Sequence, residues 1–160
     1  LHYPLRRQRQ MCIRDRTIVT AGYEKTAHRA GTGYCYEERD GAFVTPGTIN
    51  ILVFTNKALT DSAMVKAIMT ITEAKTAALQ DWGVESVRLY SFINEDIPDA
   101  ITKERKTSAT GTSTDGVVLT IDTNGDVLTD AGSFSLFGDT LAKAVYIGIQ
   151  RALENAIGAE

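Results

Sequence analysis

The sequence has little of the residue types on which several common kinds of site depend. Its 160 residues include two cysteines, two histidines and three prolines. Residues 17–160 contain one cysteine, Cys35, and one histidine, His28. A single cysteine excludes an internal disulfide and favours a reducing, cytoplasmic location. One histidine and one cysteine are also too few for a zinc site built from several such ligands, so we expect no metal.

Long apolar runs and an excess of basic charge are also missing. No run approaches the roughly 18 residues of a membrane span, so we expect no membrane partner. The chain has 17 basic and 20 acidic residues; residues 1–16 hold five arginines and one aspartate, which leaves 12 basic and 19 acidic residues and a net charge of −7. Because a phosphate backbone is bound by clustered Lys and Arg, we expect no nucleic-acid partner.

Residues 1–16 differ in character from the rest of the chain. The run MCIRDR at residues 11–16 matches the translation of a transposase-type sequencing adapter, and residues 6–10 match the adapter bases before it. A targeting presequence would instead be serine-rich and amphipathic, which this segment is not. We therefore expect residues 1–16 to be a non-native, disordered tail. Residues 17–160 are expected to form a single domain that lacks its N-terminal part.

Short apolar segments bounded by turn residues predict four strands. They are expected at residues 17–22, 46–56, 84–93 and 117–121, with a long loop at 23–46 and a solvated turn or short helix at 94–109. The segment 46–56 gives the strongest signal, because β-branched and aromatic residues lie between Pro-Gly and Asn-Lys; it is expected to be a central strand, buried at least partly on both faces. The Asn124-Gly125 pair predicts a hairpin in which residues 127–129 pair back with the strand before it.

Helical periodicity predicts two amphipathic helices, over residues 59–82 and 136–155. On the first, one face is formed by Met64, Ala67, Ile68, Ile71, Ala74, Ala78 and Trp82. Thr60 or Asp61 is expected to cap its start and Gly83 to end it. On the second, Gly138 and Gly148 lie in or near the apolar face and permit close packing. The predicted fold is α+β, with an α/β-like two-layer arrangement in which a mixed sheet of four to five strands is packed by the two helices.

Three polar clusters interrupt these apolar surroundings and are candidates for a site. They are Thr48 with Asn50, the run Thr72-Glu73-Ala74-Lys75, and the run from Thr110 to Asp115. Asn50 needs a partner from the protein or from a ligand, because it lies on a buried strand. Glu73 and Lys75 project about 200° apart on a helix and cannot pair, so either one faces a cleft or both are surface charges. The third run offers backbone N–H groups able to hold an anion or an amide oxygen, although such turns also occur without a function.

Together these runs resemble the adenosylcobinamide amidohydrolase family, the CbiZ type. The matching motifs are GTINI at 47–51, TEAKTAALQD at 72–81, ATGTSTD at 109–115, and the Ala131-Gly132 pair followed by Gly138 and a helix. The resemblance covers nearly all of residues 17–160. It implies a corrinoid substrate and hydrolysis of the amide between the corrin ring side chain and aminopropanol, which gives adenosylcobyric acid in cobamide (vitamin B12) salvage. No required cofactor is evident from the sequence.

Two departures from the family pattern keep other functions open. The family usually has glycine where Ser113 stands, and a basic residue followed by histidine where Ser133 and Phe134 stand. The alternatives are a non-catalytic corrinoid-binding protein of the same fold, or a hydrolase of another small-molecule amide. If strands are missing at the front, an unpaired sheet edge would favour a homo-oligomer.

Amide hydrolysis requires an activated nucleophile, donors for the oxyanion and an acid for the leaving amine. We predict that Glu73, Lys75 and Asp115 are catalytic: one of the two carboxylates activates water or a hydroxyl group, and Lys75 stabilises charge. The predicted substrate-binding residues are Thr48, Asn50, Thr110, Thr112, Thr114 and Ser133. Asn50, or the backbone amides of Thr112 to Thr114, would hold the carbonyl oxygen. His28 lies in a predicted loop and is a weak candidate for a triad.

Overall fold

The computed structural model describes residues 16–23, 27–31, 48–86 and 107–157. In chain order the elements are β1 (Arg16–Ala21), β2 (Ala27–His28), β3 (Ile49–Phe54), β4 (Ala58–Leu59), α1 (Asp61–Trp82), β5 (Gly111–Thr112), β6 (Gly116–Thr120), β7 (Val127–Leu128) and α2 (Leu136–Ile157). The predicted α+β class is confirmed. Arg16, the last residue of the expected tail, begins β1 opposite Phe54.

The principal sheet has three strands in the order β1-β3-β6. β3 is central: β1 pairs with it in antiparallel orientation and β6 in parallel orientation, so the sheet is mixed as predicted. The other strands form two separate pairs, β2 with β5 and β4 with β7. Among the described residues, seven strands therefore form three sheets, and the largest has three strands where four to five were expected in one sheet.

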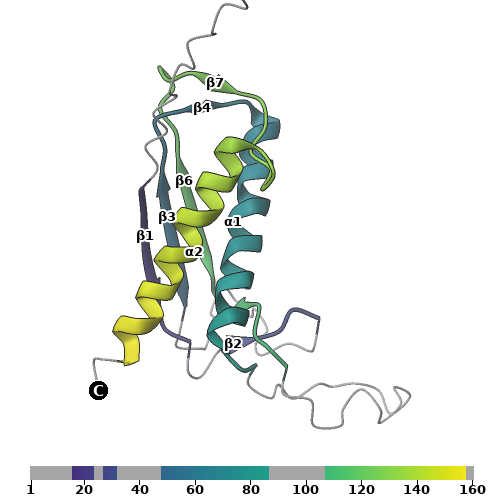
Figure 1. Ribbon diagram of the computed structural model, residues 1–160, viewed down its shortest axis with the longest axis vertical. Coiled ribbons are helices and arrows are strands. Elements are labelled where there is room, and N and C mark those ends of the chain that lie inside the picture. Colours follow the sequence, from purple (N-terminus) through teal and green to yellow (C-terminus); the bar gives the residue numbers. More distant parts are fainter. Residues whose placement is uncertain (1–15, 24–26, 32–47, 87–106, 158–160) are drawn as a thin grey trace, which may run out of the picture.

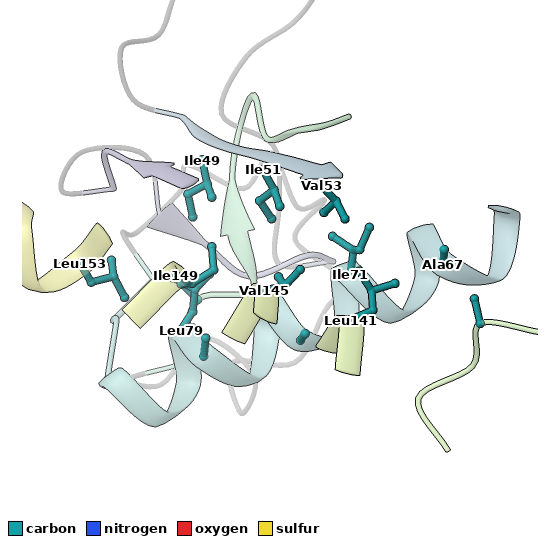
Figure 2. Close-up of a cluster of buried hydrophobic side chains, with 14 of the residues drawn as sticks. Ile49, Ile51, Val53, Ala67, Ile71, Leu79, Leu141, Val145, Ile149 and Leu153 are labelled. Carbon is teal, nitrogen blue, oxygen red and sulfur yellow. The ribbon is translucent and has the colours of Figure 1, made fainter. Parts of the chain in front are cut away.

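Both helices lie on one face of the principal sheet (Figure 1). Ile49, Ile51 and Val53 of β3 point toward them and are fully buried, whereas the alternate residues of this strand are only partly buried or exposed. Burial on both faces was predicted for this strand, and it is complete only on the helix side. Figure 2 shows these three side chains above residues that α1 and α2 contribute to the same core, which include Ile71, Leu79, Leu141, Val145, Ile149 and Leu153.

Helix α1 begins and ends where the sequence predicts. The Thr60 hydroxyl accepts a hydrogen bond from the Ala63 N–H at 3.3 Å, and Gly83 ends the helix with a left-handed φ of 80°. Most of the predicted apolar face is buried, but Ile68 is 39% exposed. The buried face instead extends to Ala63, Thr70, Lys75 and Leu79. It is wider than one stripe because α1 contacts both α2 and the strands.

The hairpin predicted after β6 is wrong. Gly125 does close a turn, since its N–H donates to the Asp122 carbonyl oxygen at 3.0 Å. The chain then runs to β4, with which β7 pairs in parallel orientation. The N–H groups of Ala58 and Thr60 donate to the carbonyl oxygens of Asp126 and Leu128, both at 3.1 Å. β7 thus pairs with β4, in the backbone that precedes α1, and not with β6 as expected.

Other predicted segments lie partly outside the described residues. The predicted strand at 84–93 is described only as far as residue 86, where Glu85 forms a single antiparallel bridge with Ser108. Most of the polar stretch at 94–109 and most of the long loop at 23–46 are likewise outside the described ranges. Within that loop, β2 pairs in antiparallel orientation with β5. Among the described residues, no helix has the length and apolar character needed to cross a membrane.

A polar contact joins the two helices near the end of α1. The Tyr146 hydroxyl donates to Asp81 Oδ2 at 2.8 Å and accepts from Gln150 Nε2 at 2.9 Å. The hydrogen bond to Asp81 raises the pKa of Tyr146, and partial desolvation raises it further. The phenol therefore keeps the proton that it donates to Asp81 to a higher pH than a free tyrosine would.

Two glycines allow α2 to approach its neighbours closely. A Cβ at Gly138 would overlap the carbonyl oxygen of Gly132, which is part of the backbone and cannot move alone. At Gly148 the nearest atom to an added Cβ would be Cγ2 of Val19, at 2.9 Å, and this side chain can adjust. The predicted role of both glycines in close packing is confirmed, but the first position is the stricter one.

We therefore expect Gly148 to tolerate substitution by alanine better than Gly138. Gly138→Ala should lower the free energy of unfolding by about 1–3 kcal/mol, because the backbone of the preceding loop must shift. In Gly148→Ala the side-chain crowding is offset by up to about 1 kcal/mol of helix propensity, so the net change should be smaller. Urea unfolding followed by circular dichroism measures both, and equal losses at the two positions would contradict this packing.

Candidate active site

A shielded ion pair joins α1 to the loop before β6. The Lys75 ammonium pairs with Asp115 Oδ2, and the two side chains are only 11% and 14% exposed. In two other ion pairs, Lys57–Asp126 and Lys143–Asp139, the carboxylate is 74% and 48% exposed. Charges withdrawn from water are costly unless they are paired, so Lys75 and Asp115 depend on each other.

The second oxygen of Asp115 is held by three donors. Asp115 Oδ1 accepts hydrogen bonds from the Thr112 N–H at 3.1 Å, the Thr112 hydroxyl at 2.5 Å and the Ile49 N–H at 3.3 Å. The two bonds from Thr112 close the short turn between β5 and β6. This one carboxylate therefore connects α1, β3 and the threonine loop, here defined as residues 110–115.

Gly111 makes room for this arrangement. A Cβ at this position would overlap Asp115 Oδ2 and lie 2.7 Å from Lys75 Nζ. Any other residue would therefore push the ion pair apart. This explains in physical terms why the predicted loop has a glycine between two threonines.

The other threonines of the cluster hydrogen-bond the two ends of the threonine loop to neighbouring segments. The Thr48 hydroxyl donates to the Thr114 carbonyl oxygen at 2.6 Å. The Thr110 N–H donates to the His28 carbonyl oxygen, and the Thr110 hydroxyl accepts from the Ala30 N–H, both at 2.9 Å. The structure thus brings Thr48, Thr110, Thr112 and Thr114 together with Lys75 and Asp115. In the structure, the hydroxyl groups of Thr48, Thr110 and Thr112 make contacts that position the loop.

Glu73 lies apart from this cluster. It is exposed, and its Oε2 accepts a hydrogen bond from the Ser133 hydroxyl at 3.2 Å. Lys75 is buried on another side of the same helix, as the rotation of about 200° between the two positions requires. Of the two alternatives, the structure excludes the one in which both are surface charges: Glu73 faces solvent, whereas Lys75 is buried against Asp115. Phe134, which follows Ser133, is fully exposed.

Asn50 also lies apart from the ion pair. Side chains alternate along β3, and Asn50 belongs to the set that faces away from the helices. Its Nδ2 donates to the Thr20 hydroxyl at 3.4 Å, and its Oδ1 lies against Gly116 of the neighbouring strand. Asn50 therefore has the partner that the sequence required, supplied by the sheet, and it is not next to Lys75.

Sequence reasoning missed the link between Lys75 and Asp115, which are forty residues apart in the chain. One signal was present: Lys75 is spaced four residues after Ile71 and four before Leu79, both of them core residues. A lysine at such a position needs a buried counter-ion. Among the residues that the structure describes, no three His, Cys, Asp or Glu side chains gather in a way that would hold a metal ion.

Comparison with known proteins adds a family match. The chain matches the family described as adenosylcobinamide amidohydrolase (CbiZ) over residues 5–160. It is 37% identical over 148 residues to a protein of Methanocaldococcus jannaschii described as uncharacterized, a match that covers 85% of this chain and 52% of that protein. It is 32% identical over 146 residues to the adenosylcobinamide amidohydrolase of Methanosarcina mazei, and this match covers 86% of this chain and 60% of that protein.

The chain therefore spans a little over half the length of these curated relatives. No solved structure matches it significantly. The matched range takes in all the residues that form the cluster around Lys75 and Asp115.

The ion pair predicts a strong energetic coupling. In a double-mutant cycle with Lys75→Met and Asp115→Asn, each single change should be destabilising, and the coupling energy should be about 1–3 kcal/mol because either side chain left alone keeps a shielded polar group without its partner. The same cycle at the exposed Lys143–Asp139 pair is the control, with an expected coupling of about 0.3–0.5 kcal/mol. Equal coupling energies in the two cycles would show that shielding does not strengthen the Lys75–Asp115 pair.

Proposed function

Since this chain belongs to the adenosylcobinamide amidohydrolase family, we propose that it hydrolyses the amide between the corrin ring side chain of adenosylcobinamide and aminopropanol. The products are adenosylcobyric acid and free aminopropanol, and the reaction serves cobamide salvage in the cytoplasm. The observation that carries this proposal is the Lys75–Asp115 pair, a shielded contact that joins α1 to the threonine loop within the range that matches the family.

The geometry supplies groups that amide hydrolysis needs. Asp115 is an oriented carboxylate, fixed by Lys75 on one oxygen and by Thr112 and Ile49 on the other. In our proposal it accepts the proton of the attacking group, and Lys75 stabilises the negative charge that develops on the carbonyl oxygen. Low exposure strengthens the stabilisation by Lys75, since electrostatic interactions are less screened away from bulk water.

Glu73 takes a secondary place in this proposal. Its carboxylate is exposed and paired with Ser133 on another side of α1, so it is poorly placed to share a reacting atom with Lys75. We propose that Glu73 and Ser133 contact the periphery of a corrinoid, whose many amide side chains offer hydrogen-bond donors. Neither a metal nor an organic cofactor is part of the proposed reaction.

One observation favours a second candidate function. Phe134 is fully exposed at the position where the family usually has histidine. If that histidine transfers a proton in relatives, Phe134 cannot replace it. The alternative is then a corrinoid-binding protein that holds the same ligand without cleaving it.

The test is to incubate the purified 160-residue chain with adenosylcobinamide and to follow both products by mass spectrometry. We expect both products from the wild-type chain. Asp115→Asn should lower the turnover at least a hundredfold, the effect typical of a lost general base. Glu73→Gln should lower it less than tenfold, and Asp139→Asn, at an exposed ion pair on α2, should leave it unchanged.

Two outcomes would contradict the proposal. Tight binding of the corrinoid by a folded wild-type chain that releases no product would favour the binding protein. Wild-type turnover in Asp115→Asn would remove the catalytic role of the ion pair.

A further inference from the structure

The hydroxyl group of Thr112 has a contact that goes beyond closing a turn. Its Oγ1 lies 2.5 Å from Asp115 Oδ1, at the short end of the range for a hydroxyl bonded to a carboxylate. The backbone N–H of the same residue already donates to this oxygen at 3.1 Å. The turn is therefore held by a backbone bond, and the hydroxyl bond is an addition to it.

The surroundings of this hydroxyl are those of an activated nucleophile. A threonine hydroxyl is a weak nucleophile unless an adjacent base accepts its proton, and the base is usually oriented by a third group. Here Asp115 is the adjacent base, and Lys75 is the third group, because it pairs with the other carboxylate oxygen. Thr112 is only 6% exposed, so its hydrogen bond to Asp115 is shielded from bulk solvent.

From this arrangement we infer that Thr112 is the nucleophile of the reaction, and that cleavage passes through a covalent ester between Thr112 and the corrinoid acyl group. This inference rests on the proposed amide hydrolysis and adds the identity of the attacking atom. Water that attacks the amide directly is the competing route.

The two steps balance without any further reactant. In the first, Thr112 Oγ1 bonds to the amide carbon, the carbon–nitrogen bond breaks, and the hydroxyl proton passes through Asp115 to the leaving amine nitrogen. In the second, water adds to the ester carbon and the bond from that carbon to Oγ1 breaks. One proton of the water returns to Oγ1, which regenerates the enzyme and releases the acid.

The first test looks for the ester in the wild-type chain. Acid quenching during turnover of adenosylcobinamide, followed by intact-protein and peptide mass spectrometry, should show the substrate mass less aminopropanol on the peptide that contains Thr112. Added hydroxylamine should intercept the same ester and give the hydroxamate of the corrinoid. Turnover that yields neither the adduct nor the hydroxamate would overturn the inference, and the proposed hydrolysis would stand.

The second test uses substitutions matched in shape. Thr112→Val removes the hydroxyl and should lower turnover at least a thousandfold, whereas Thr112→Ser keeps a hydroxyl and should remain within about tenfold of the wild type. Thr140→Val is the control, because the Thr140 hydroxyl donates to the Leu136 carbonyl oxygen of its own helix, in α2. Circular dichroism checks that the variants are folded.

The outcomes separate this inference from the proposed function. If Thr112→Val turns over within tenfold of the wild type, the nucleophile assignment fails and water is the attacking group. If the folded wild-type chain cleaves no adenosylcobinamide, the proposed function fails, and the nucleophile assignment falls with it.

Discussion

The pairing of Lys75 with Asp115 is the interaction on which the arrangement of the candidate site depends. A lysine that is nine-tenths buried on a core-facing side of α1 is tolerable only because a carboxylate reaches it. That carboxylate can reach it because Gly111 has no side chain and because Ile49 and Thr112 orient its other oxygen. The helix, the central strand and the threonine loop are therefore brought together at one carboxylate.

The rest of the fold holds Asp115 and its hydrogen-bond partners in place. The central position of β3 fixes the backbone N–H of Ile49, and parallel pairing with β6 brings the start of that strand, and hence Asp115, beside it. α1 is held in place by the core it shares with α2, shown in Figure 2, and by the Tyr146–Asp81 contact near its C-terminal end. The threonine loop is fastened on both sides, by Thr48 and by Thr110. A site built in this way is preorganised, which is what electrostatic stabilisation of a transition state requires.

Much of the fold was predictable from local patterns. The cap at Thr60, the glycine at Gly83 and the apolar period placed α1 correctly, because these signals act within a few residues. The pairing of β7 with β4 was not predictable in this way. The Asn124-Gly125 turn does form, but the partner of the following strand is chosen by the backbone before α1, which is far away in the sequence.

The site was predictable in its residues more than in its arrangement. The three polar clusters contain all the groups that surround Asp115 apart from the backbone N–H of Ile49. Their grouping depends on tertiary contacts that no spacing rule supplies. Strand alternation turns Asn50 to the far face of the sheet, and helix rotation separates Glu73 from Lys75. Both of these positions could be predicted from the strand and helix periods of the sequence. The contact between Lys75 and Asp115 could not, because it depends on how the elements pack together.

In the proposed reaction, the substrate amide is cleaved at the Lys75–Asp115 pair. A crystal structure of the slow Asp115→Asn variant with adenosylcobinamide bound would test it most directly. We expect the amide carbonyl to lie between the Lys75 ammonium and the Thr112 hydroxyl, with the corrin ring outside the threonine loop. A complex in which the amide lies beside Glu73 and Ser133, or on the outer face of the sheet near Asn50, would contradict it.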